Sequence, residues 1–164
     1  MDVIIDGYNL IGIDGGLRDS LEHKRNWLIQ QLAAYRKVKG LGIVVVFDGW
    51  RAGGIDEVEE KRDGVGIVYS RQGEKADSLI VRIARTKGSG CVVVSSDREI
   101  QKAVEKFGAV AISSGDFADI IRSLERPFES DYEELEAPML KKGNPNRLSK
   151  VERRRQDVLK KLRP

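Results

Sequence analysis

Residues 43–48 read IVVVFD, an unbroken apolar run that ends in an acid, and this pattern decides the fold. Two further runs of the same kind occur, VIID at residues 3–6 and VVVSSD at residues 92–97. Runs rich in Val and Ile without alternation are typical of parallel strands that are buried on both faces. Because the carboxyl ends of parallel strands lie along one edge of a sheet, we expect the three acids to meet at that edge.

Strand-like runs alternate with helical patterns along most of the chain. This alternation implies right-handed crossovers and a three-layer α/β fold, in which helices flank a central parallel sheet. Residues 49–65 interrupt the alternation, and we interpret them as a substrate loop or, more plainly, as a surface excursion. Strands are expected near residues 2–5, 43–47, 66–69, 91–95 and 109–112, and helices near 17–38, 76–87, 98–107 and 116–125.

Composition and charge narrow the class of protein. The 164 residues suit one domain with a single hydrophobic core. No apolar run approaches the roughly 20 residues that a membrane-spanning helix needs, so we expect no membrane partner. A single cysteine that is buried in a strand fits the reducing cytoplasm, which is the expected location. The single cysteine, Cys91, lies in an apolar strand run, which excludes a disulfide framework and a cysteine-based zinc site. Residues 141–164 carry ten Lys and Arg against two acids, whereas residues 1–140 carry nineteen against twenty-four.

The basic charge belongs to a C-terminal segment with its own helix signals. Residues 1–127 are expected to form the core of the domain, and residues 128–147 an acidic linker that ends in a Gly-Asn-Pro-Asn breaker. Ser149 and Glu152 have the spacing of a capping box. Residues 148–164 are therefore predicted to be a basic helix.

Two sets of basic residues are candidates for binding phosphates. Arg153, Arg154 and Arg155 are consecutive on the predicted C-terminal helix and fan across a wide arc of it. They suit an arm for a polyanion such as RNA and, equally well, a solvated helix face. Arg71 and Lys75 precede the helix near residue 76 and fit a phosphate clamp only slightly better than surface charge.

Asp6, Asp77 and Asp97 are the strongest candidates for a metal site. Carboxylates at one sheet edge repel each other unless a cation holds them, and Mg²⁺ or Mn²⁺ takes such oxygen ligands. Each acid alone is more simply a turn residue or a helix N-cap, but three together favour the metal. For Asp48 the turn interpretation and the metal-ligand interpretation are equally good. Asn9 is interpreted as a turn residue or as a group that orients a carboxylate. Carboxylate sites that hold divalent metal ions can hydrolyse phosphodiester bonds.

Four short motifs occur in an order that resembles a known family. They are DGYN at residues 6–9, VFDG at 46–49, AD at 76–77 and SSD at 95–97. Each is weak alone, but the ordered set is similar to the NYN domain, a branch of the PIN-like ribonucleases, and in particular to the YacP-like family. The resemblance covers essentially the whole chain, including the C-terminal helix.

The resemblance implies a three-layer PIN-like domain with a central parallel sheet and a metal-dependent endoribonuclease whose cofactor is Mg²⁺ or Mn²⁺. Related bacterial proteins suggest cleavage of mRNA in connection with the ribosome, which makes RNA and the ribosome the expected partners. The resemblance assigns metal binding to Asp6, Asp77 and Asp97, and support of the site to Asn9. Many PIN-like sites have a fourth acid, for which the candidates here are Asp48, Glu99 and Asp116.

Competing interpretations fit the residues less well. A receiver domain expects two acids after its first strand, and a haloacid-dehalogenase-type phosphatase needs a D-x-D motif; Asp6-Gly7-Tyr8 supplies neither. His23, the single histidine, lies among charged residues and suits the surface better than catalysis. Trp50 suits base stacking and packing equally. The main alternative is a non-catalytic RNA- or ribosome-binding module that uses the basic C-terminal helix.

Overall fold

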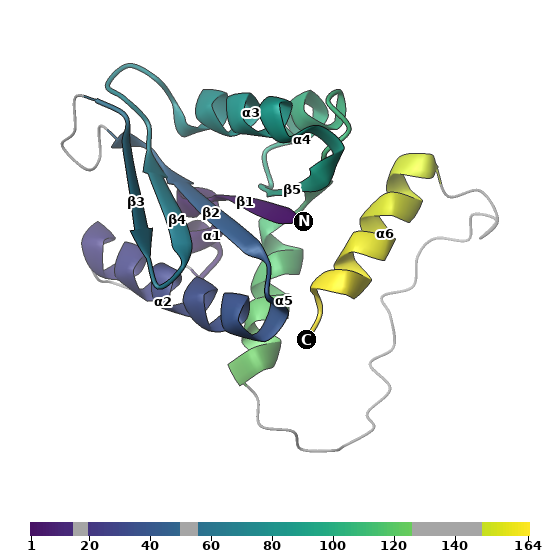
Figure 1. The fold of residues 1–164 in the computed structure, drawn as a ribbon, viewed down its shortest axis with the longest axis horizontal. Coiled ribbons are helices and arrows are strands. Elements are labelled where there is room, and N and C mark those ends of the chain that lie inside the picture. Colours follow the sequence, from purple (N-terminus) through teal and green to yellow (C-terminus); the bar gives the residue numbers. More distant parts are fainter. Residues whose placement is uncertain (15–19, 50–55, 126–148) are drawn as a thin grey trace.

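The computed structural model describes residues 1–14, 20–49, 56–125 and 149–164, and it shows a central sheet between layers of helices (Figure 1). The predicted three-layer α/β fold is confirmed. The acidic linker predicted at residues 128–147 lies outside the described residues. Within the described part of the chain the sheet has six strands: β1 Asp2–Asp6, β2 Gly42–Phe47, β3 Val58–Arg62, β4 Val65–Tyr69, β5 Cys91–Val94 and β6 Val110–Ile112.

The strands lie in the order β3-β4-β2-β1-β5-β6, and every neighbouring pair except β3 and β4 is parallel. From β1 the chain moves outward through β2 and β4 in one direction, and then through β5 and β6 in the other. Residues 3–5, 45–47 and 92–94 are almost fully buried, because helices cover both faces of the central strands. In such sheets, ligands bind outside the carboxyl ends of the strands where the winding reverses, here between β1 and β5.

Two apolar clusters, one on each face of the sheet, form the core. The helical elements of the described residues are α1 Gly7–Ile11, η1 Gly12–Asp14, α2 Leu21–Lys39, α3 Ala76–Lys87, η3 Gly88–Gly90, α4 Arg98–Glu105, α5 Ser114–Glu125 and α6 Lys150–Leu162. On one face Ile5 packs with Leu32 of α2 and Phe117 of α5. On the other face Ile4 packs with Leu79 of α3, and α4 contributes to the same cluster.

The segment interpreted as a loop, residues 49–65, contains a strand that the sequence analysis missed. β3 pairs antiparallel with β4 across a tight turn in which Asp63 and Gly64 have φ values of 51° and 84°. Asp-Gly is a residue pair that tight hairpins favour. All five residues of β3 are exposed, since it is an edge strand, and its charges discourage pairing with another chain. The loop prediction was therefore wrong for Val58–Arg62, while residues 50–55 lie outside the described part.

The predicted C-terminal helix is present as α6 (Figure 1), and it packs beside β6. Ser149 Oγ accepts a hydrogen bond from the N–H of Glu152 at 3.2 Å, as a capping box requires. Tyr35 of α2 is fully buried, and its hydroxyl donates to the backbone O of Leu162 at 2.7 Å. Leu162 is also buried. Val151 is apolar too, but it is half exposed and is not among the described residues that pack against the core. Among the described residues, no helix has the length and apolar character that crossing a membrane requires.

Candidate active site at the carboxyl edge of the sheet

Three adjacent strands deliver acids to one edge of the sheet. Asp6 ends β1, Asp48 follows β2 directly, and Asp97 lies shortly after β5, while Asp77 is in the first turn of α3, which follows β4. Burial raises the pKa of Asp6 and of Asp77, and repulsion adds to it. Asp77 and Asp48 act on Asp6 in this way, and Asp97 and Asp48 act on Asp77. The structure thus brings these carboxylates within range of one another, while their role as metal ligands stays a prediction.

Asp6 is buried, with 7% of its surface exposed. Its Oδ1 accepts a hydrogen bond from the N–H of Asn9 at 3.2 Å, and its Oδ2 accepts one from Ser95 Oγ at 3.2 Å. Burial raises the pKa of Asp6 from 3.8 to about 6, although these two hydrogen bonds oppose the rise. The ionised form therefore costs folding free energy at neutral pH, and a nearby cation would reduce that cost.

Asp48 and Asp97 each use one carboxylate oxygen at a helix start. Asp48 Oδ1 accepts a hydrogen bond from the N–H of Ala76 at 2.6 Å and so caps α3 from a separate strand. Asp97 is the N-cap of α4, and its Oδ1 accepts from the N–H of Glu99 at 2.7 Å. No described residue donates to the second oxygen of either acid. The capping and metal-binding interpretations are therefore compatible, because they use different oxygens.

A network of serines holds Asn9, and part of it was missed by the sequence analysis. Asn9 Oδ1 accepts hydrogen bonds from the N–H of Ser96 at 3.0 Å and from Ser114 Oγ at 2.6 Å. Ser114 begins α5 and is fully buried, and its own N–H donates to Ser96 Oγ at 3.1 Å. The available signal was that Ser113 and Ser114 follow β6 in the way that Ser95 and Ser96 follow β5.

The two predicted phosphate-binding groups near Asp77 are both exposed. Arg71 forms an ion pair with Glu74 at 3.4 Å, and 68% of the Arg71 side chain is exposed. The Lys75 ammonium partly offsets the burial that raises the pKa of Asp77, so the two side chains are close enough to interact. The role of Arg71 and Lys75 as a clamp stays a prediction.

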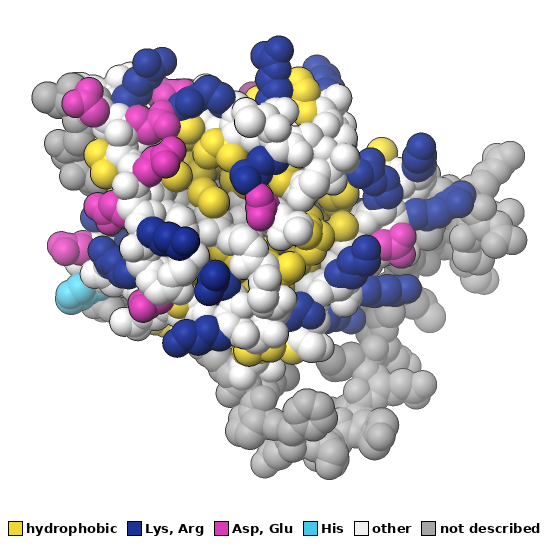
Figure 2. All heavy atoms as spheres, in the orientation of Figure 1, with side chains coloured by type: hydrophobic (Ala, Val, Ile, Leu, Met, Phe, Trp, Pro, Cys, Tyr) yellow, Lys and Arg dark blue, Asp and Glu magenta, His cyan; other side chains and the backbone are white. Residues whose placement is uncertain are grey.

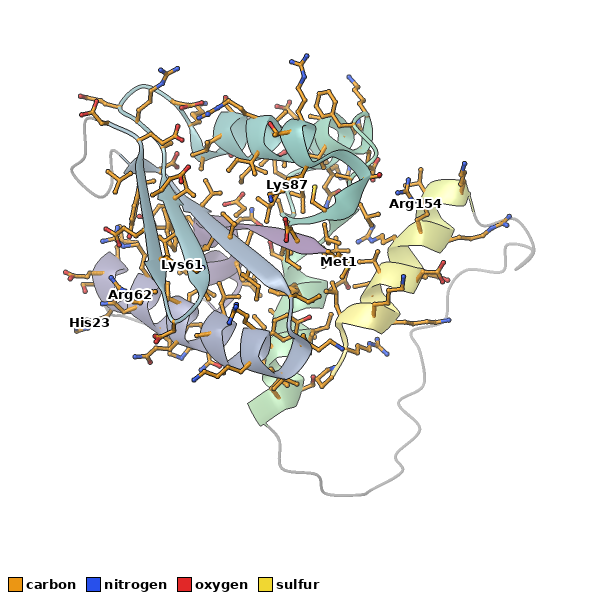
Figure 3. All side chains as sticks on the ribbon, viewed as in Figure 1. Met1, His23, Lys61, Arg62, Lys87 and Arg154 are labelled. Carbon is orange, nitrogen blue, oxygen red and sulfur yellow. The ribbon has the colours of Figure 1, made fainter. Side chains whose placement is uncertain are left out.

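Lys and Arg side chains gather over α6 (Figure 2). Arg153 and Arg154 are exposed, and Arg154, labelled in Figure 3, donates from Nη2 to the backbone O of Gly108 at 3.1 Å. Arg155 is half buried and forms an ion pair with Asp116 of α5 at 3.1 Å. Arg154 and Arg155 therefore both help to hold the helix on the body of the domain. RNA contact by the exposed Arg153 and Arg154 stays a prediction.

The structure favours one of the three candidates for a fourth acid. Asp48 is the one whose charge acts on both Asp6 and Asp77. Asp116 instead pairs with α6, and Glu99 is exposed on α4.

The remaining residues considered for chemistry have structural or surface positions. His23 is exposed on α2 (Figure 3), as predicted. Cys91 is buried in β5, also as predicted. Trp50 lies outside the described residues.

The donor set suits a hard divalent ion. No three His, Cys, Asp or Glu side chains in the described ranges form a group that could hold a metal ion as they stand. Mg²⁺, however, needs only one or two carboxylates, because water and phosphate oxygens fill its other positions. The acids at this edge repel one another, and the pKa of Asp6 is raised to about 6. A divalent ion would stabilise their ionised forms. The residues present therefore fit it.

A parallel three-layer α/β fold with acids along its carboxyl edge is the fold of the PIN-like nucleases. The chain belongs to the YacP-like NYN domain family, whose model matches residues 3–163. It is 30% identical over 137 residues to the uncharacterized protein YacP of Bacillus subtilis (strain 168), covering 79% of this chain and 80% of that protein. The crystal structure of Rae1 (YacP) from Bacillus subtilis matches it with a TM-score of 0.64 and 26% identity, covering 76% of this chain and 75% of that chain. A tryptophan-to-leucine mutant of Rae1 matches with a TM-score of 0.63 and 26% identity, covering 76% of each chain.

Proposed function

We propose that the protein is a metal-dependent endoribonuclease that hydrolyses RNA phosphodiester bonds with Mg²⁺ or Mn²⁺. The observation that carries the proposal is the set of acids at the carboxyl edge, where burial and mutual repulsion raise the pKa of Asp6 to about 6. Membership of the YacP-like NYN family supports nuclease chemistry on this fold.

Asp6, Asp77 and Asp97 are the proposed metal ligands, with Asp48 as the fourth candidate. A bound ion would activate the attacking water and stabilise charge on the leaving oxygen. Ser95 is fully buried and joins two of these ligands, because its Oγ donates to Asp6 and receives the N–H of Asp97 at 3.1 Å. One hydroxyl thereby sets the relative position of acids from neighbouring strands.

RNA would be held by cations near the acids and by cations on α6, whose Arg154 contacts Gly108 before the start of β6. Arg71 and Lys75 would contact a phosphate near Asp77, and Arg153 and Arg154 would contact phosphates along α6. mRNA on the ribosome, in the cytoplasm, is the substrate that the family resemblance suggests. Cosedimentation of the protein with ribosomes over a salt series tests that partner, and a protein that stays in the supernatant at every salt concentration would contradict it.

A non-catalytic RNA- or ribosome-binding module is the second candidate function. The gathering of Lys and Arg over α6 favours it (Figure 2), and so does the use of Asp48 and Asp97 as helix caps. In that case the acids would be structural, and RNA binding would not lead to cleavage.

The deciding experiment incubates the wild-type protein with a structured RNA in Mg²⁺, in Mn²⁺ and in EDTA. The nuclease proposal expects cleavage with either ion and none in EDTA. Asp97→Asn should abolish cleavage and keep the fold, because Asn also caps helices well. Asp119→Asn is the matched control, since it removes one exposed acid that pairs with Arg122 on the surface of α5. Binding by the wild type without ion-dependent cleavage would favour the alternative.

A further inference from the structure

The orientation of the Asn9 side-chain amide is determined by its neighbours. Its backbone N–H bonds to Asp6 at the end of β1, and its Oδ1 accepts from Ser96 after β5 and from Ser114 after β6. The backbone N–H of Ser96 can only donate, so the amide atom that faces it must be the oxygen and not the nitrogen. The amide therefore cannot flip without losing this hydrogen bond.

The nitrogen of the amide, Nδ2, is consequently the atom that is available to a ligand. Two donors occupy the two lone pairs of Asn9 Oδ1, which is the atom through which Asn would bind a metal. None of the described residues accepts a hydrogen bond from Nδ2, and no buried side-chain nitrogen or oxygen in the described part of the chain lacks a partner. Asn9 Nδ2 is thus accessible, and the residue that carries it lies next to two of the acids in the fold, since Asn9 bonds to Asp6 and to the neighbour of Asp97.

We propose that Ser114 is a positioning residue that presents Asn9 Nδ2 as a hydrogen-bond donor to a phosphate oxygen of the bound RNA. The inference rests on the proposed function and names a phosphate-recognition group within it. A Lys or Arg among these acids would pair with them and compete with the cation for their charge. A neutral amide binds a phosphate oxygen without that competition. Ser114 is suited to hold it, because it is fully buried and its N–H is itself fixed by Ser96.

Ser113 provides a matched control one residue away. Its Oγ donates to Asp116 Oδ2 at 2.7 Å and accepts the N–H of Asp116 at 3.1 Å, so its hydroxyl stabilises the start of α5. It has no hydrogen bond to Asn9 among the described residues. Loss of the Ser113 hydroxyl should therefore affect stability and leave phosphate recognition unchanged.

The experiment measures the affinity for a short, fluorescein-labelled single-stranded RNA in EDTA, by fluorescence anisotropy, together with the melting temperature of each variant. Asn9→Asp keeps the shape and still accepts from both serines, but it replaces the donor by a charged acceptor. It should weaken RNA binding about tenfold, as expected for one hydrogen bond to a charged group. Ser114→Ala should weaken binding about threefold, and Ser114→Thr, which restores the hydroxyl, should recover it. Ser113→Ala should lower the melting temperature and leave the affinity unchanged.

Several results would overturn the inference. Wild-type RNA affinity in Asn9→Asp would do so, as would tighter Mg²⁺ binding by that variant without a change in RNA affinity, which would make position 9 a ligand site. Equal losses in Ser113→Ala and Ser114→Ala would assign both hydroxyls to stability alone. If Ser114→Thr fails to fold, Asn9→Asp decides the matter. Because no arm requires cleavage, a wild type that binds RNA but never cleaves it contradicts the nuclease proposal and leaves this inference standing.

Discussion

Replacing Asp6 by Asn should make the metal-free protein more stable at neutral pH, although Asp6 is a proposed metal ligand. Burial, with added repulsion from Asp77 and Asp48, raises the pKa of Asp6 from 3.8 to about 6. The folded protein therefore holds this proton more tightly than the unfolded chain does. The stability that the group contributes is fully present below pH 3.8 and is lost as the pH rises through about 6. Asn has the same shape and carries no charge to desolvate.

The size of the effect follows from the shift. A pKa difference of about two units corresponds to about 3 kcal/mol at neutral pH. Part of this is offset, because the NH2 group of Asn cannot accept, so one of the two hydrogen bonds that Asp6 accepts is lost at a cost of about 1 kcal/mol. The net gain of about 2 kcal/mol corresponds to a rise in melting temperature of roughly 4–8 °C for a chain of this length.

The assay is thermal unfolding of wild type and Asp6→Asn, followed by circular dichroism in EDTA across a pH series. The two melting temperatures should differ at about pH 7 and converge below about pH 4, where Asp6 is protonated in both states. Added Mg²⁺ should stabilise the wild type more than the variant, because an ion that binds only the folded state favours folding. A variant that is less stable than wild type at neutral pH, or that differs equally at both pH values, would refute the reasoning.

Two further predictions concern the packing behind the site and the basic helix. Gly49→Ala should cost at least about 1–3 kcal/mol, because a Cβ there would overlap the backbone O of Ser70, whereas Gly12→Ala should be close to neutral, since nothing lies within 4 Å of its Cβ position. Urea unfolding compares the two variants, and equal midpoints would contradict the packing argument. Replacing Arg153 and Arg154 by Gln should weaken RNA binding and reduce its logarithmic salt slope by about 0.7 for each lost phosphate contact. An unchanged slope in anisotropy titrations would leave α6 as a structural brace.

The parallel strands were predictable because each is an apolar run too short for a helix and bounded by turn signals. β3 was not, since its residues are exposed and mostly charged, and its pairing with β4 comes from the turn at Asp63 and Gly64. α1 was also missed, because it is a five-residue helix that begins with Gly7, a poor helix former. The apolar pattern of the sequence therefore predicted the core strands. Elements without an apolar face, such as β3 and α1, could be recognised only from the structure.

The placement of the acids was predictable because strand ends of a parallel sheet share an edge. Their hydrogen-bond partners were not, since these depend on strand order. Asp48 caps α3, 28 residues away, and Asn9 is held by Ser114, 105 residues away. A serine after a strand has many local roles in turns, so the partner of Ser114 cannot be recognised until β6 is known to lie two strands from β1.

The two Asp-Gly pairs at the edge have a physical basis other than turn formation. Neither Gly7 nor Gly49 has a positive φ, but a Cβ on Gly7 would overlap the Phe47 ring, as one on Gly49 would overlap Ser70. Glycine therefore lets the chain after each acid lie tightly against the end of a neighbouring strand. Because this close packing holds the carboxylates near one another, it also produces part of the repulsion that raises the pKa of Asp6, after burial. The packing would therefore favour the cation that we propose at this edge, and Gly49→Ala should weaken Mg²⁺ binding as well as folding. Calorimetric titration of Mg²⁺ into that variant, with Gly12→Ala alongside, tests this link, and equal affinities in the two variants would contradict it.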